Sequence, residues 1–132
     1  MVDTRLHEIR EPEARKALAE AVLAQLDAWQ LHPVNQAALL GLEDIGSIKA
    51  GEPLPLDDEV LERTSHLLAM GRALYRLLPY QPDKRSSWLG EKNDLLDGAT
   101  PLQWMLMGLE QMRMLRRMLD TDHQQTEPGS RE

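Results

Sequence analysis

Three observations predict an all-α protein folded as a compact helical bundle. Ala and Leu are abundant, whereas Val and Ile are sparse. No long segment alternates apolar and polar residues, as a half-buried strand would. Helix-start signals recur before segments whose apolar residues lie three or four positions apart. Short connections between such segments favour a helical bundle.

The first predicted helix covers residues 12–30 and follows a flexible N-terminus at residues 1–11. Pro12 suits the first helical turn, and the acids beside it favour a helix N-terminus. The expected buried stripe of this helix consists of Leu18, Val22, Leu26 and Trp29.

Residues 33–50 predict two short helices joined by a tight turn, which is a helix-turn-helix arrangement. Pro33 opens the first helix and Gly41 takes the turn, with Ala38 and Leu42 expected to pack inward. The second helix is expected over residues 43–50. The candidate DNA-binding residues are Gln36, Ser47 and Lys49. The net charge between His32 and Leu56 is −2, which disfavours the approach of a phosphate backbone.

The rest of the chain predicts one long helix and a smaller helical region. Asp57 is the expected N-cap of a helix that continues to residue 78, where prolines end it. A short helix follows over residues 84–89, and residues 93–98 are expected to form an ordered loop. Thr100 is the expected N-cap of a last helix that ends at about Leu119.

Methionine is concentrated in that last helix, where five of the seven Met residues fall between positions 105 and 118. A continuous helix would carry two apolar stripes. The first consists of Met105, Gly108, Met112, Leu115 and Leu119, and the second of Met107, Met114 and Met118. One stripe can pack on the long helix, and the other favours a partner protein because Met is flexible and polarisable. The alternative is a central core helix covered on all sides.

The composition excludes most enzyme classes. The chain has no cysteine, its four histidines lack metal-ligand spacing, and no phosphate-binding glycine motif or serine nucleophile motif occurs. We therefore expect no catalytic residue, no metal, no cofactor and no small-molecule substrate. No apolar run approaches the roughly 18 residues of a membrane span, and the N-terminus lacks a signal-peptide pattern. We expect a cytoplasmic protein without membrane contact.

One motif resembles a known family. Residues 88–102 read Trp-Leu-x-x-x-Asn-x-x-Leu-x-Gly-x-Thr-Pro-Leu, which is similar to the toxin-binding domain of Xre/MbcA/ParS antitoxins. Lys92 stands where that family often has Pro. The resemblance covers about residues 18–119, including the helix-turn-helix segment. The motif residues are expected to fix the loop, and they are Trp88, Leu89, Asn93, Gly98, Thr100, Pro101 and Leu102.

The resemblance implies an antitoxin that dimerises and neutralises a cognate RES-type toxin, which attacks NAD. It implies an Xre-like helix-turn-helix region at 12–79 and a small toxin-binding domain at 80–120. The tail at 121–132 is polar, with Pro128 and Gly129, and its composition predicts disorder. Repression of its own operon would add operator DNA as a partner. The expected toxin contacts are Met107, Gln111, Met114, Arg117, Met118 and His123. A helix-turn-helix regulator without a toxin, or an adaptor for another protein, are the alternatives.

Overall fold

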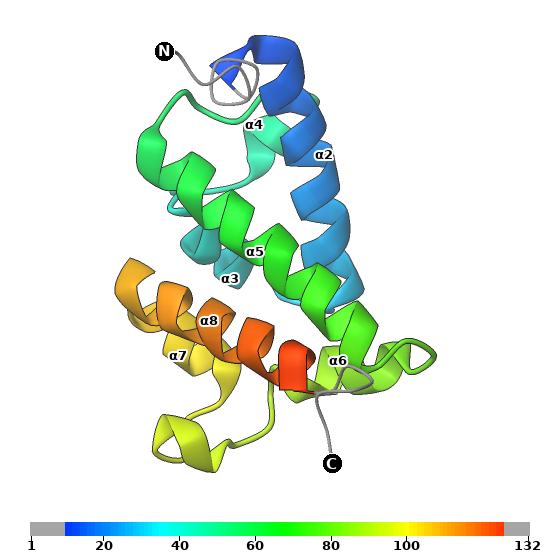
Figure 1. Cartoon of the computed structure of the whole chain (residues 1–132). Helices are drawn as coiled ribbons and strands as arrows, with labels where there is room; N and C mark the ends of the chain where they lie inside the picture. Colours follow the sequence, from blue (N-terminus) through cyan, green and yellow to red (C-terminus); the bar gives the residue numbers. More distant parts are fainter. Residues whose placement is uncertain (1–9, 126–132) are drawn as a thin grey trace, which may run out of the picture. The chain divides into compact units, whose positions relative to one another are not determined.

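The computed structural model describes residues 10–125, and within them it is all-helical without any β-strand (Figure 1). The predicted all-α class is confirmed. The residues group into two units, 1–65 and 66–132, so the division falls inside the long helix. The domain boundary that the sequence predicts, between residues 79 and 80, lies 14 residues after this division. The expected flexible N-terminus, up to residue 9, and the expected tail from residue 126 lie outside the described residues.

The first unit contains α2 (Pro12–Ala28), α3 (Pro33–Leu40), α4 (Gly46–Lys49) and the beginning of α5 (Asp58–Leu77). Pro12 and Pro33 both occupy the first turn of their helices, where the missing N–H costs nothing. Gly41 ends α3 in the left-handed conformation with φ +79°, as the turn requires. The buried apolar side chains of this unit are Ala19, Val22, Leu26, Trp29, Ala37, Leu39, Leu40, Ile45, Ile48, Leu54, Val60 and Leu61.

The predicted start of the long helix is confirmed. Asp57 Oδ1 accepts hydrogen bonds from the backbone N–H of Glu59 at 2.9 Å and of Val60 at 3.0 Å. Arg15 of α2 donates to Leu54 O at 2.7 Å and holds the segment that leads into α5. Two expectations for this region are wrong. The helix expected over 43–50 covers only Gly46–Lys49, and Ala38 is exposed because Leu39 and Leu40 take the inward positions of α3.

The second unit contains the rest of α5, α6 (Pro82–Trp88), the 3₁₀ turn η1 (Asp94–Leu96), α7 (Pro101–Met107) and α8 (Leu109–Gln125). Helices α7 and α8 pack closely on each other. The buried side chains of this unit include Leu67, Ala69, Met70, Ala73, Leu74, Leu89, Leu96, Pro101, Met105, Met112, Leu115 and Leu119.

The expected single last helix is wrong, because Gly108 divides it into α7 and α8. Gly108 has an extended backbone, with φ 159° and ψ 177°, which cannot continue a helix. Helix α8 also runs six residues past the expected end at Leu119, to Gln125. Residues 121–125 of the expected disordered tail are therefore helical.

Candidate protein-binding surface

The 88–102 motif forms a hydrogen-bonded loop that sets the start of α7. Asn93 Oδ1 accepts from the N–H of Leu95 at 2.9 Å, and its backbone carbonyl accepts from the N–H of Gly98 at 3.0 Å. Its own N–H donates to Ala99 O at 3.0 Å. Asp97 and Gly98 both have positive φ, 57° and 84°, and turn the chain back. Asn93 is thus the centre of the loop.

The end of the motif caps α7 and ties it to the preceding helix. The Thr100 hydroxyl accepts from the N–H of Gln103 at 3.0 Å, and the Gln103 side chain accepts from the N–H of Thr100 at 2.9 Å. This reciprocal pair is a capping box. Pro101 is buried at the first helical position, and the N–H of Leu102 donates to Leu89 O at 3.1 Å. Leu89 is buried, whereas Trp88 is half-buried.

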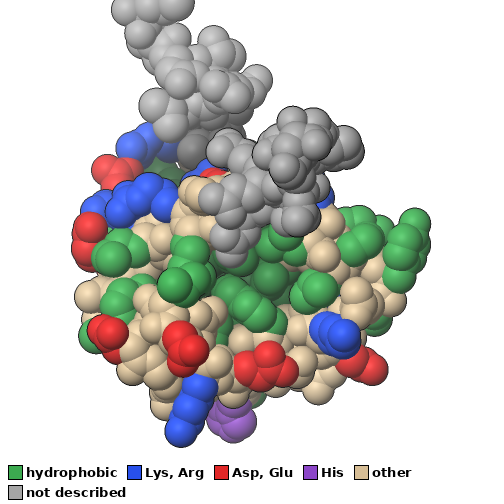
Figure 2. Space-filling view, turned by 60° about the horizontal axis from the view of Figure 1, so that its bottom comes forward, with side chains coloured by type: hydrophobic (Ala, Val, Ile, Leu, Met, Phe, Trp, Pro, Cys, Tyr) green, Lys and Arg blue, Asp and Glu red, His purple; other side chains and the backbone are tan. Residues whose placement is uncertain are grey.

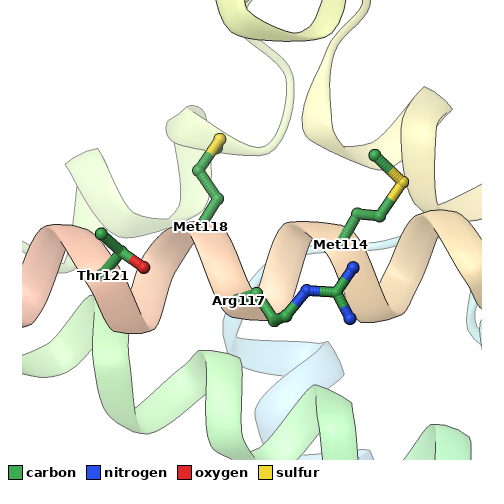
Figure 3. Close-up of a pocket in the computed structure, with 4 residues that line it drawn as sticks. All are labelled: Met114, Arg117, Met118 and Thr121. Atoms are coloured by element: carbon green, nitrogen blue, oxygen red, sulfur yellow. The ribbon is translucent and has the colours of Figure 1, made fainter.

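Helix α8 has one buried face and one exposed apolar face. Met112, Leu115 and Leu119 are each at most 2% exposed. Met114 is 42% exposed and Met118 is half-buried. Among the described residues, four line an open hollow of about 490 Å³, which we call the Met surface: Met114, Arg117, Met118 and Thr121. Figure 3 shows both Met side chains projecting from one side of α8.

The Met surface brings together three of the six expected toxin contacts, Met114, Arg117 and Met118. Met107 is 63% exposed but belongs to α7, so the break at Gly108 removes it from the stripe expected of a continuous helix. Gln111 is half-buried and does not line the hollow. The side chain of His123 lies outside the described residues.

Charge around the Met surface is mixed. Arg117 is exposed. Arg116 has two polar neighbours: its Nη1 lies 3.0 Å from His66 Nδ1, and its Nε lies 3.8 Å from Asp120 Oδ2. Arg113 forms a long ion pair with Glu110 at 3.4 Å. Figure 2 shows one face of the molecule, on which hydrophobic, acidic and basic side chains all appear.

The candidate DNA-binding residues do not form one surface. Gln36 is 2% exposed, and its Nε2 donates to Asp27 Oδ1 and to Leu31 O, both at 2.9 Å. It is therefore a structural residue, and its expected role as a DNA contact is wrong. Ser47 and Lys49 are exposed on α4. Sequence reasoning missed Gln36 because an amide side chain after a helix start is usually exposed.

A second hollow, of about 340 Å³, lies between α3 and α4. Apolar side chains form its floor, and Glu43, Asp44 and Lys49 contribute its charges. Asp44 Oδ1 also accepts from the N–H of Gly46 at 2.7 Å, which supports the start of α4. This acidic rim is the opposite of what a phosphate backbone needs.

Two other kinds of site are absent from residues 10–125. No group of three His, Asp or Glu side chains in this part of the chain could hold a metal ion. None of its helices is long and apolar enough to cross a membrane.

Comparison with known proteins gives a relative but no function. No family model matches the chain. Over 93 residues the chain is 37% identical to a protein of Sinorhizobium fredii that bears the name "Uncharacterized protein y4oB". The matched segment spans 67% of this chain and 70% of that relative. At this identity and coverage, the chain belongs to the same family as y4oB of Sinorhizobium fredii.

Proposed function

We propose that this protein is an antitoxin that binds and neutralises a cognate toxin protein, of the RES type that attacks NAD, through the Met surface of α8. The proposal rests on the observation that α8 has apolar side chains on two different faces. Its inner face is buried, yet Met114 stays 42% exposed beside Met118 and Arg117. An exposed apolar side chain contributes little to folding, but it can be buried in an interface.

The chemistry of the Met surface suits a protein partner. Methionine side chains adapt to irregular surfaces, and arginine is enriched at protein interfaces. The resemblance of residues 88–102 to the antitoxin motif supports the choice of a toxin as that partner. In this proposal, the capped loop around Asn93 and Thr100 positions α7 and α8 and does not itself contact the toxin.

Direct reading of operator DNA by residues 33–50 has less support. Gln36 is buried, α4 has four residues, and Glu43 and Asp44 are exposed near the only Lys of the segment. We therefore place the toxin first among partners. Operator binding would need a second copy of the chain or the toxin to supply the basic surface.

Co-expression with the product of the neighbouring gene tests the proposal. The toxin should co-purify with this chain, and its toxicity should return when Met114→Asp is introduced. Met114→Asp should keep the circular dichroism spectrum and melting temperature of the wild type, because position 114 is exposed. It should weaken the complex by about 100-fold or more, since a charge would be buried in an apolar contact.

Two variants control this experiment. Leu56→Asp makes the same kind of change at a residue that is 56% exposed in the first unit, and it should leave toxin binding unchanged. Met112→Asp places the charge at a fully buried position and should unfold the chain. If Met114→Asp binds the toxin as tightly as Leu56→Asp does, the Met surface is not the contact. If the neighbouring product does not bind at all, the antitoxin assignment is wrong.

A further inference from the structure

Lys and Arg side chains of α5 and α6 lie in a part of the chain that is poor in acids. Residues 63–82 contain no Asp or Glu, although the whole chain has 22 acids against 15 Lys and Arg. Arg72 and Arg76 are exposed on α5, and neither forms an ion pair with any acid that the structure describes. Residues four positions apart share one face of a helix, so the two guanidinium groups are neighbours.

Two exposed tyrosines accompany these cations. Tyr75 lies between the two arginines in sequence and is 58% exposed, and Tyr80 is 91% exposed just beyond the end of α5. The guanidinium of Arg85, from α6, stacks over the Tyr75 ring at 5.0 Å from its centroid. The same side chain donates to Leu78 O, which fixes α6 against the end of α5. We use the name basic tyrosine face for the cations and tyrosines within residues 72–85, which are Arg72, Tyr75, Arg76, Tyr80, Lys84 and Arg85. The exposed Asp83 is the one acid within this range.

The distribution of charge along the chain isolates this face. Residues 1–65 hold six Lys and Arg against 13 Asp and Glu, whereas residues 66–132 hold nine of each. Within residues 66–92 there are five Lys and Arg and only two acids. A polyanion would therefore be repelled by the first unit and attracted to the basic tyrosine face.

We propose that the basic tyrosine face binds a single-stranded polynucleotide. Arginine and lysine neutralise phosphates, and an exposed ring stacks on an unpaired base whatever its sequence. An acidic protein surface could also form ion pairs with these Arg and Lys side chains. The Tyr75 ring, however, has the Arg85 guanidinium over its face and lies between Arg72 and Arg76 in sequence, which favours a polyanion with unpaired bases over an apolar protein contact. This inference stands independently of toxin binding, which uses α8.

Fluorescence anisotropy with the full chain tests the proposal. The probes are oligo(dT), oligo(U) and a duplex of mixed sequence, each about 16 nucleotides long. Both single strands should bind more tightly than the duplex. Affinity should fall with salt at a logarithmic slope of about −2, as expected for three phosphates contacted by Arg72, Arg76 and Lys84.

Variants that remove positive charges test whether the polynucleotide binds at the basic tyrosine face. Arg72→Gln with Arg76→Gln should weaken binding about 10-fold at low salt and reduce the slope to about −0.7, because two phosphates are no longer neutralised. The matched control is Arg10→Gln with Lys16→Gln, which also removes two positive charges, here from exposed positions of the first unit. That control should change the affinity by less than about 2-fold.

A ring variant separates stacking from charge. Tyr80→Ala should weaken single-strand binding about 5-fold or more and leave the salt slope unchanged, because it removes a stacking ring but no cation. Circular dichroism should show that all of these variants keep the wild-type helix content, since every altered side chain is exposed.

Several results would overturn the proposal. The first is no binding to either single strand at about 20 mM salt, where phosphate contacts are strongest. The second is an equal loss of affinity in the Arg72 and Arg76 variant and in its charge control, which would mean that binding has no defined location. The third is duplex binding that Tyr80→Ala leaves unchanged. A change of oligomeric state in the arginine variant, with no polynucleotide bound by the wild type, would make the face a protein interface.

Discussion

Met105 and Met112 are fully buried, whereas Met107 and Met114 are 63% and 42% exposed. These four residues lie within ten positions of the sequence, and their chemistry is the same. The expected inner stripe of the last helical segment is confirmed at Met105, Met112 and the two leucines that follow. The difference between the two Met pairs comes from which side of each helix faces the rest of the second unit.

Gln36 and Trp104 show that polar groups are harder to place than apolar ones. Gln36 has two acceptors at 2.9 Å for its buried amide, so its burial is compensated. The indole N–H of Trp104 is buried without an acceptor among the described residues. An unpaired buried donor of this kind costs about 1–3 kcal/mol.

Trp104→Phe should therefore change the free energy of unfolding by less than about 1 kcal/mol. The variant removes the unpaired donor, and this gain offsets the weaker apolar packing of the smaller ring. Trp104→Ala is the control and should cost about 2 kcal/mol or more, because the whole ring is removed. Urea unfolding followed by circular dichroism measures both values. A destabilisation by Trp104→Phe as large as that by Trp104→Ala would show that the indole N–H is paired.

At the scale of elements, helix starts follow the local sequence closely. Pro12, Pro33, Asp57 and Thr100 begin their helices at the expected positions or within one residue of them. The break at Gly108 does not follow from local signals alone. A glycine lowers helix stability by about 1 kcal/mol, which permits a break but does not require one. The break is accompanied by close packing of α7 on α8, which a continuous helix could not form.

Thr100→Ala should reduce the free energy of unfolding by about 1 kcal/mol, because the N–H of Gln103 loses its acceptor at the start of α7. Thr121→Ala is the matched control, since Thr121 is exposed within α8 and caps no helix. It should change stability by less than about 0.5 kcal/mol. Chemical denaturation of both variants gives the comparison. Equal losses at the two positions would mean that the capping box does not stabilise α7.

At the scale of the whole molecule, the formal charge is unevenly divided. The net charge of −7 falls entirely on residues 1–65, and residues 66–132 are balanced. In the described part of the first unit, the ion pairs of Arg10 with Asp58 and of Arg63 with Glu59 involve exposed carboxylates. Such exposed pairs contribute little, so repulsion among the acids of this unit is the larger effect.

Added salt should therefore stabilise the protein. Raising NaCl from about 20 mM to 500 mM shortens the screening length and weakens this repulsion, which should raise the melting temperature by about 2–5 °C. Hydrogen exchange should locate the added protection in α2 and α3 rather than in α8. A fall in melting temperature with salt would show that attractive ion pairs dominate the first unit.

The sequence by itself determined the all-α class, the helix starts, the turn at Gly41 and the inner stripe of the last helical segment. These features depend on caps, prolines and spacing within a few residues, so the local sequence contains the information. Only the tertiary structure decided that Gln36 is buried, that Gly108 separates α7 from α8, and that Met114 and Met118 share a surface without Met107. Each of these depends on how neighbouring helices pack on one another, and packing energy outweighs the small local preferences for one conformation over another.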